Sequence, residues 1–235
     1  NRMVRVSQVN RFFMIKIYWI PMLLCLVPIL TRAQDPWKDI YRESAWEQRD
    51  AWQRADDIIA RLNIKRGSKV ADIGCHEGYF SVKLSKKVDA NGKVFAVDVS
   101  KDKIEKLTKH LADRNISNVV TVLGKEDDPG LPAAALDAVL IVDTYHEMDA
   151  HQEILRHIRE ALKKEGRLVI CEPISEERKG LTRQEQERKH ELGMNYALED
   201  LKKAGFTILS KQEAFVDRLK EKGDKMWLIV CEKSN

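Results

Sequence analysis

Three carboxylates follow hydrophobic runs in the first two thirds of the chain. Asp72 lies in VADIG, Asp98 closes VFAVD and Asp143 closes VLIVD. An acid in the place of Asp72 repels a pyrophosphate and suits a ligand with a free amino group or a sulfonium. An acid in the place of Asp98 can accept both hydroxyls of a ribose. The pattern therefore favours a nucleoside-like ligand that carries cationic groups.

The segment between Gly74 and Gly78 is typical of a turn from a buried strand into a helix. Dinucleotide-binding turns have the pattern G-x-G-x-x-G, in which glycines let the backbone approach a pyrophosphate. Here the middle glycine is replaced by His76. Histidine tolerates a positive φ better than most residues with a side chain, so we expect a left-handed His76 whose side chain points away from the ligand. Three alternatives stay open for His76. It could be a plain turn residue, it could act as a catalytic base, or it could mark a turn that no longer binds a ligand.

The acids also have structural alternatives. Asp72 could cap the helix that follows the turn, and Asp98 or Ser100 could cap the helix that starts at 101. Two acids at the ends of neighbouring strands nevertheless favour ligand contact. Glu126 and Asp127, in GKEDDPG after the third hydrophobic run, could border an adenine.

Metal-ligand spacing is absent from the cysteines and histidines. The four cysteines form no CxxC pair, and Cys171 and Cys231 lie in apolar runs that are typical of buried thiols. His146 and His151 form H-E-x-x-x-H, one residue longer than the H-E-x-x-H of zinc-binding helices, so the two imidazoles do not share a helix face. We therefore predict no metal site.

These residues must be positioned by alternating strands and helices. The expected strands are 69–73, 93–99, 118–123, 136–143, 167–173, 206–212 and 225–233. The expected helices are 36–63, 79–88, 101–115, 149–164 and 183–204. The first five strands are almost continuously apolar, as in a parallel sheet covered on both faces. We predict an α/β fold: a doubly wound, mostly parallel seven-stranded sheet with a C-terminal antiparallel hairpin.

The first 33 residues differ from the rest. They contain five basic residues and no acidic one: Arg2, Arg5, Arg11, Lys16 and Arg32. The net charge of the whole chain is +4, so the remainder is close to neutral and gives no electrostatic case for nucleic acid. Residues 15–30 are almost wholly apolar and TRA follows them, which is typical of a signal peptide or a membrane anchor.

This leader sets the predicted domain plan and location. Residues 1–13 lie upstream of a plausible true start at Met14, and 1–33 form the signal peptide or anchor. Residues 34–66 form a helical segment and 67–235 the main domain. We expect the protein to be exported (periplasmic or secreted) or membrane-associated through 15–30, and cytoplasmic if the leader has no function. No oligomeric state is predicted.

The ordered motifs over residues 44–232 resemble those of the class I S-adenosylmethionine-dependent methyltransferases. VADIGCHEGYF resembles their glycine-rich first motif, VFAVDVS the second, VLGKEDDPGLPAAALDAVLIVDTYHEMD the third and fourth, and LKKEGRLVICEP the fifth-strand segment. The resemblance implies a Rossmann-like methyltransferase fold, S-adenosyl-L-methionine as cofactor and a small-molecule methyl acceptor. It also implies the set of cofactor-binding residues: Asp72, Gly74, His76, Gly78, Asp98, Glu126, Asp127 and Asp143.

The resemblance places DTYHEMD (143–149) beside the methyl donor and the acceptor. It implies Asp143, Tyr145 and His146 as catalytic residues, with Asp143 under the methyl donor and the other two facing the acceptor with Glu147. His146 would act as a base only if the acceptor must lose a proton. The (N/D)-P-P-(Y/F) motif of methyltransferases that act on nucleic-acid bases is absent here, and an arsenite acceptor is disfavoured by the scarcity of cysteines.

Other aromatic and histidine residues could border the ligands. Tyr41, Trp46 and Trp52 precede the core, where they either pack onto the sheet or form a lid. His190 and Tyr196 could line the acceptor pocket. Two other functions stay open: a nicotinamide-dependent oxidoreductase, which Asp72 and the missing glycine disfavour, and a non-catalytic adenosine-ligand or partner-binding protein on the same fold.

Overall fold

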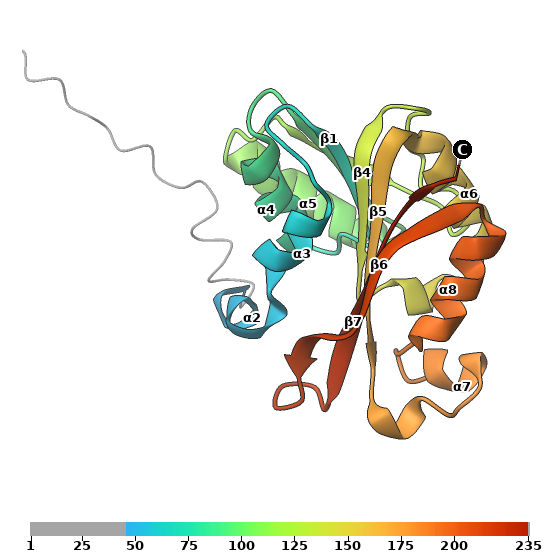
Figure 1. Ribbon diagram of the computed structural model, residues 1–235. Coiled ribbons are helices and arrows are strands. Elements are labelled where there is room, and N and C mark those ends of the chain that lie inside the picture. The colour runs from blue at the N-terminus through green and yellow to red at the C-terminus, as the bar shows by residue number, and fades with distance from the viewer. Residues whose placement is uncertain (1–45, 235) are drawn as a thin grey trace, which may run out of the picture. The chain divides into compact units, whose positions relative to one another are not determined.

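The computed structural model describes residues 46–234 (Figure 1). The predicted leader lies outside this range, and so do residues 34–45, which include Tyr41. A seven-stranded sheet forms the centre, in the order β3-β2-β1-β4-β5-β7-β6. The strands are β1 (Lys69–Ile73), β2 (Lys93–Asp98), β3 (Val119–Leu123), β4 (Leu136–Val142), β5 (Leu162–Ile174), β6 (Phe206–Arg218) and β7 (Asp224–Lys233). The helices are α2 (Trp46–Gln53), α3 (Ala55–Arg61), α4 (Tyr79–Val88), α5 (Lys101–Asp113), α6 (His151–Ala161), α7 (Arg183–Glu187) and α8 (Met194–Lys203).

The strand directions confirm the predicted fold. β1 pairs in parallel with β2 and β4, β2 with β3, and β4 with β5. β7 runs antiparallel to β5 and to β6, which forms the C-terminal hairpin. The strand order reverses between β1 and β4, and the crevice beyond the carboxyl ends of strands at such a reversal is where open α/β sheets bind ligands.

Helices cover both faces of the sheet, which explains the continuous apolar character of its strands (Figure 1). On one face, α3, α4 and α5 contribute buried side chains such as Ile58, Leu84 and Leu107. On the other, α6 and α8 contribute Leu155 and Leu201. Burial of each such side chain contributes roughly 1.5–3 kcal/mol, so the two faces together hold the strand ends in place.

Several elements differ from the sequence-based expectation, among them β5, which begins at Leu162 where the preceding helix was expected to continue to 164. The amino-terminal helix is broken into α2 and α3 at Arg54, whose φ of 53° is left-handed. The helix expected over 183–204 is two helices, because the chain leaves helical geometry after Arg188 and returns at Met194. β6 continues to Arg218 through two register shifts, although a loop was expected from 213.

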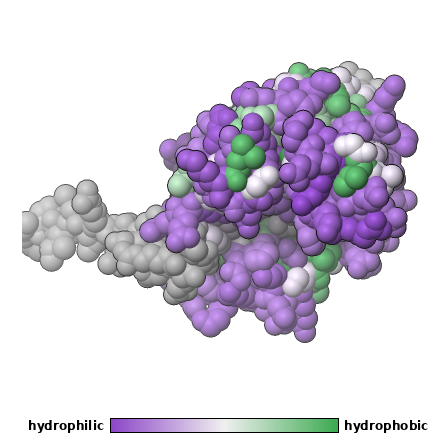
Figure 2. Space-filling view, turned by 90° about the horizontal axis from the view of Figure 1, so that it is seen from below, coloured by the Kyte–Doolittle hydropathy of each residue, from purple (hydrophilic) through white to green (hydrophobic). Residues whose placement is uncertain are grey.

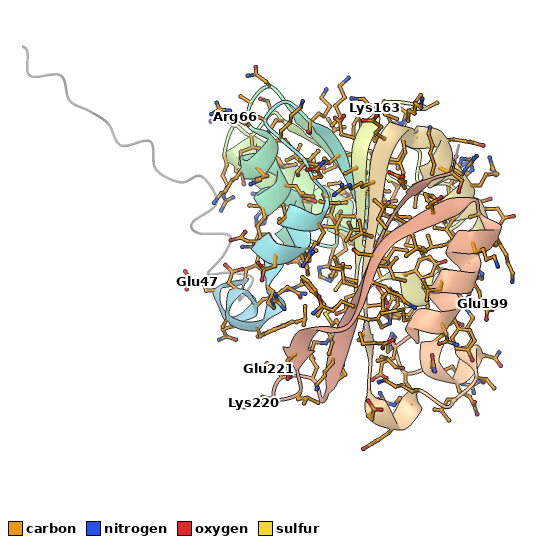
Figure 3. The ribbon with its side chains drawn as sticks, viewed as in Figure 1. Glu47, Arg66, Lys163, Glu199, Lys220 and Glu221 are labelled. Carbon is orange, nitrogen blue, oxygen red and sulfur yellow. The ribbon has the colours of Figure 1, made fainter. Side chains whose placement is uncertain are left out.

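The surface of the described residues is mostly polar. Figure 2 shows hydrophilic residues over most of one face, with isolated hydrophobic ones between them. Charged side chains of both signs point outward at the periphery, among them Glu47, Lys163 and Glu199 (Figure 3). Among residues 46–234 no helix combines the length and the apolar character that a membrane crossing requires.

Candidate active site

A cavity of about 600 Å³ lies at the carboxyl ends of β1, β2 and β4. Its walls come from α2, the turn 72–77, the segments 97–100 and 125–129, and the segment 142–149 that follows β4. The cavity thus occupies the crevice at the reversal of strand order. Acidic side chains outnumber basic ones in its wall, as a cationic ligand requires.

The turn between β1 and α4 keeps a tight left-handed path despite the histidine. Gly74, His76 and Gly78 have φ angles of 74°, 52° and 95°. A Cβ on Gly74 would lie 2.2 Å from the side chain of Thr144, so glycine is needed there for the turn to pack against the end of β4. The expected left-handed conformation of His76 is confirmed. His76 is exposed and belongs to the cavity wall, and that its side chain points away from the ligand stays a prediction.

The carboxylate of Asp98 ties the end of β2 to this turn. Its Oδ2 accepts a hydrogen bond from the backbone N–H of His76 at 2.8 Å, and its Oδ1 accepts one from Ser100 N–H at 2.8 Å. The side chain of Ser100 makes no capping hydrogen bond, which corrects the expectation that it caps α5. Asp98 lines the cavity, so its carboxylate fixes the turn and borders the ligand space at once.

Asp72 lies deeper in the same wall. Its side chain is 3% exposed, and it accepts a hydrogen bond from Ser81 Oγ at 2.6 Å. Burial raises the pKa of this carboxyl to about 6, although the Ser81 hydrogen bond and the charge of Arg49 oppose the rise. The hydrogen bond to the first turn of α4 agrees with the capping alternative, and the cavity position agrees with ligand contact.

Arg49 is a cavity residue that the sequence did not single out. It reaches the cavity from α2, stacks over the Tyr79 ring at 4.2 Å, and donates to Gln53 Oε1 at 2.9 Å. Burial lowers its pKa, an effect that the nearby Asp143 and Asp72 oppose. The only sequence signal was its place three residues after Trp46 in an amphipathic segment. Trp46 also lines the cavity and packs in the core.

Of the two candidate acids after β3, one belongs to the cavity wall and the other does not. Glu126 borders the cavity together with Lys125 and Pro129. Asp127 is exposed and lies outside the cavity wall, in contrast to its expected place beside the ligand. The physical reason is that this loop bends back on itself, with Lys125 N–H donating to Asp128 O at 2.8 Å, so that successive side chains diverge.

Asp143 lines the cavity directly after β4, as the resemblance implied. Its φ of 57° is left-handed, a conformation that aspartate adopts only at a cost. Its Oδ2 lies 2.7 Å from Arg218 Nη1, and the same buried guanidinium pairs with Asp224 in the hairpin. These two carboxylates raise the pKa of Arg218 against the opposing effect of burial. Arg218 was missed because the end of β6 was expected to be a loop.

Tyr145 does not face the acceptor side of the cavity. Its ring is fully buried against α6 and α8, and its hydroxyl donates to Asp200 Oδ2 at 3.0 Å. Burial and the Asp200 charge raise the pKa of this phenol. The short 3₁₀ helix Tyr145–Glu147 turns the ring inward, so the expected catalytic position is corrected to a core position.

His146 also lies outside the cavity wall, although Glu147 belongs to it. His146 is 5% exposed and its Nδ1 lies 2.6 Å from Oε2 of Glu172, a fully buried carboxylate on β5. Glu172 also accepts hydrogen bonds from the backbone N–H groups of Thr144 and Tyr145 at 2.6 and 2.9 Å. Hydrogen bonding to Glu172 raises the pKa of His146, against the opposing effect of burial.

The remaining candidates lie outside the cavity wall. Tyr196 donates to Leu181 O at 3.2 Å, and Trp52 packs against the core. His151 Nε2 lies 3.3 Å from Asp200 Oδ1. His190 instead packs edge-on against the His146 ring, with the ring centroids 5.7 Å apart. Cys171 and Cys231 are fully buried free thiols, as expected.

Comparison with known proteins identifies a matching family. A family model described as "Methyltransferase domain" matches residues 64–226. This span runs from the segment before β1 into β7 and includes every cavity-lining segment except α2.

Individual relatives are distant. The chain is 23% identical to a demethylmenaquinone methyltransferase of Geobacillus sp. (strain WCH70) over 50% of each chain. It is 31% identical to (S)-coclaurine N-methyltransferase of Thalictrum flavum subsp. glaucum over 47% of this chain and 30% of the relative. The chain thus spans about half or less of the length of these curated relatives.

Solved structures share the fold. The crystal structure of a SAM-dependent methyltransferase from Aquifex aeolicus superposes with a TM-score of 0.64 at 21% identity, over 75% of this chain and 88% of that one. Geranyl diphosphate C-methyltransferase from Streptomyces coelicolor A3(2), solved with Mg²⁺, geranyl diphosphate and S-adenosyl-L-homocysteine, superposes with a TM-score of 0.63 at 13% identity, over 77% and 78%. At these identities the likeness concerns the fold alone.

Proposed function

The chain belongs to the class I S-adenosylmethionine-dependent methyltransferase family, and from that premise we propose that it transfers the methyl group of S-adenosylmethionine to a small-molecule acceptor. The observation that carries the proposal is the meeting of Asp72 and Asp98 in one cavity. They reach it from the ends of two neighbouring parallel strands, β1 and β2, at the reversal of strand order.

The residues of the cavity fit this cofactor. A cavity of about 600 Å³ suits a nucleoside-sized ligand with room for an acceptor. In this proposal Asp98 accepts ribose hydroxyls, Glu126 borders the adenine, and Asp72 and Asp143 hold cationic groups. Arg49 and the other cations of the wall leave a carboxylate on the ligand a partner.

The proposed chemistry asks little covalent work of the protein. When bound, S-adenosylmethionine supplies a methyl group that its sulfonium makes electrophilic. The chain supplies alignment and the exclusion of water, which together can contribute most of the rate of a direct displacement. Trp46, Tyr79 and Phe80 give the cavity an apolar side, and Arg218 holds the Asp143 carboxylate. No step is assigned to Tyr145, because its hydroxyl is occupied by Asp200.

A small molecule is the proposed acceptor class because the named relatives act on such compounds. Their printed names give demethylmenaquinone and (S)-coclaurine as substrates. The segment after β4 also lacks the (N/D)-P-P-(Y/F) motif of base-methylating relatives. The open alternatives of a nicotinamide enzyme and a non-catalytic binding protein gain no support from the comparisons.

The first test is calorimetric titration of S-adenosylhomocysteine, the demethylated product, into the full chain. We expect micromolar binding, and at least tenfold weaker binding by Asp98→Asn, because an amide cannot accept from two N–H groups and a ribose as the carboxylate does. Asp102→Asn is the matched control, since it removes an exposed acid four residues away that lies outside the cavity wall. Equal binding by both variants, or no binding by folded protein, would refute the proposal.

A further inference from the structure

Beside the cavity lies a cluster of three side chains that the proposed methyl transfer does not use. His146 and Glu147 come from the 3₁₀ helix after β4, and His190 from the segment between α7 and α8. One ligand atom from each lies within 4.8 Å of the other two. Glu147 Oε1 is 3.8 Å from His146 Nε2 and 3.4 Å from His190 Nδ1. Two imidazole nitrogens and one carboxylate oxygen thus converge on one point.

The buried imidazole of His146 is oriented by a carboxylate, in the way that is typical of metal-binding histidines. His146 Nδ1 lies 2.6 Å from the fully buried carboxylate of Glu172. A carboxylate has no proton to give, so in the neutral imidazole Nδ1 carries the hydrogen and Nε2 presents its lone pair to the cluster. Histidine ligands of metals characteristically donate their other N–H to a carboxylate in this manner, which fixes the tautomer and the ring orientation.

The backbone brings His190 to this point through contacts with β5. Leu192 N–H donates to Pro173 O at 2.9 Å, and the buried carboxylate of Glu191 accepts from Ser175 N–H at 2.9 Å. The residue before this anchored pair, His190, has a left-handed φ of 56°. Because β5 also carries Glu172, the same strand end fixes the position of both histidines, although they lie 44 residues apart in the numbering.

We propose that His146, Glu147 and His190 form a binding site for one divalent transition-metal ion beside the cavity, which it borders through Glu147. A set of two histidines and one carboxylate suits Zn²⁺ and similar ions, whereas Mg²⁺ and Ca²⁺ prefer oxygen ligands. Bonds near 2.0–2.2 Å in a tetrahedral site separate ligand atoms by roughly 3.3–3.6 Å. The cluster needs only small rotations to reach that spacing, and the side chains of Glu147 and His190 are largely exposed to solvent.

The place of the cluster gives the metal a function that rests on the proposed methyl transfer. Glu147 lines the cavity next to Met148 and Asp149. Three protein ligands leave an open position on the ion. An oxygen or sulfur atom of the acceptor in that position would be oriented toward the methyl donor and would lose its proton more readily. The site therefore favours an acceptor with a hydroxyl or thiol group.

The test uses the full chain after removal of metals with a chelator. Zn²⁺ is titrated by calorimetry, and Co²⁺ by the visible absorption that a tetrahedral site produces. We expect one ion per chain with micromolar or tighter affinity, and at least tenfold weaker binding by His190→Ala and by Glu147→Ala. Both variants change exposed side chains, so the fold is expected to survive where His146→Ala could disturb the core.

A matched control keeps surface histidines from being mistaken for the site. His157 lies 3.8 Å from Asp128 and 3.7 Å from Glu160, a histidine between two carboxylates without a second imidazole. His157→Ala is expected to bind the metal like the parent. No stoichiometric binding by the parent, or equal binding by the parent and His190→Ala, would overturn the proposal.

Failure of the metal site is distinguishable from failure of the proposed function. S-adenosylhomocysteine is titrated into the same metal-free protein, because its expected contacts at Asp72 and Asp98 do not involve the cluster. Binding of the nucleoside without binding of the metal would refute the metal site alone. Binding of the metal without binding of the nucleoside would refute the methyltransferase proposal and leave the metal site standing.

Discussion

A carboxylate as buried as that of Asp72 is costly to ionise, and this cost makes its charge responsive to pH. Burial raises its pKa to about 6, while Arg49 and Ser81 hold the rise in check and Asp98 adds to it. A cationic ligand group stabilises the ionised form. Ligand binding and protonation of Asp72 therefore compete.

We predict that the affinity for S-adenosylhomocysteine falls about tenfold between pH 7 and pH 5, because most of Asp72 is protonated at the lower pH. Calorimetric titration across this range measures the effect. Asp72→Asn is expected to bind weakly and with a flat pH profile. A parent profile as flat as that of the variant would show that Asp72 does not contact the ligand.

The same shift affects stability with the opposite sign. The folded-state pKa of Asp72 lies above its unfolded value of 3.8, so its ionised form destabilises the folded protein at neutral pH. This destabilisation is relieved as the pH falls from above 6 toward 4. The binding role and the stability role of one carboxylate are thus separable by pH.

His76 stands where the family pattern has a glycine, and it keeps the left-handed backbone conformation of the turn. We predict that His76→Gly changes the free energy of unfolding by less than about 1 kcal/mol, because relief of the left-handed strain is offset by greater chain entropy in the unfolded state. The affinity for S-adenosylhomocysteine is expected to change less than about threefold, because the backbone N–H of residue 76 still donates its hydrogen bond to Asp98. Chemical denaturation and calorimetry measure the two quantities.

Gly78→Ala provides the contrast for this prediction. A Cβ there would lie 2.6 Å from the Leu107 side chain, and its φ of 95° is unsuited to alanine. We expect Gly78→Ala to lose roughly 1–3 kcal/mol of the free energy of unfolding.

A large gain in affinity for S-adenosylhomocysteine in His76→Gly would contradict the prediction for that variant, because it would mean that the imidazole obstructs the cavity.

At the scale of elements, the junction between β4 and α6 depends on buried polar contacts. Glu172 on β5 accepts hydrogen bonds from three backbone N–H groups of this junction, and the hydroxyl of Tyr145 joins the junction to Asp200 on α8. Hydrogen bonds therefore anchor the junction to both β5 and α8. Asp143 and Glu147, which both belong to this junction, line the cavity.

The core position of Tyr145 gives a sharp prediction. Tyr145→Phe is expected to lower the free energy of unfolding by about 1 kcal/mol, because one buried hydrogen bond is lost while Asp200 keeps its pairs with Arg183 and His151. The affinity for S-adenosylhomocysteine is expected to stay unchanged. Tyr196→Phe is the control, with a smaller stability loss. A selective loss of affinity or turnover in Tyr145→Phe would return the residue to the site.

Elements were more predictable from the sequence than the contacts between them. β1, α4 and α5 were expected near their observed bounds, since unbroken apolar runs and helical periodicity act locally. The break at Arg54 and the extension of β6 to Arg218 depend on packing against other strands, which a local pattern does not carry. The meeting of Asp72 and Asp98 was predictable because strand ends meet at one sheet edge, and the family resemblance implied Asp143. Glu172 reads as an ordinary strand residue until the fold places His146 against it.

At the scale of the whole molecule, the cavity collects segments from residue 46 to residue 154. These segments come from four strands or the loops that follow them and from the helices α2, α4, α5 and α6, so the ligand space exists only when most of the described domain is folded. A ligand that binds only the folded state stabilises it in proportion to its concentration over its dissociation constant. Binding is therefore coupled to the global unfolding of the domain.

This coupling predicts the thermal behaviour of the full chain. S-adenosylhomocysteine at a hundred times its dissociation constant contributes about 2.7 kcal/mol, and for a domain of this size we expect Tm to rise by roughly 5–10 °C. Asp98→Asn at the same concentration is expected to show a rise of less than about half that size. Scanning calorimetry checks the shift and whether one transition or two is displaced. A ligand shift confined to part of the transition would show that the cavity belongs to a subregion that unfolds on its own, because only structure coupled to the site gains stability from the ligand.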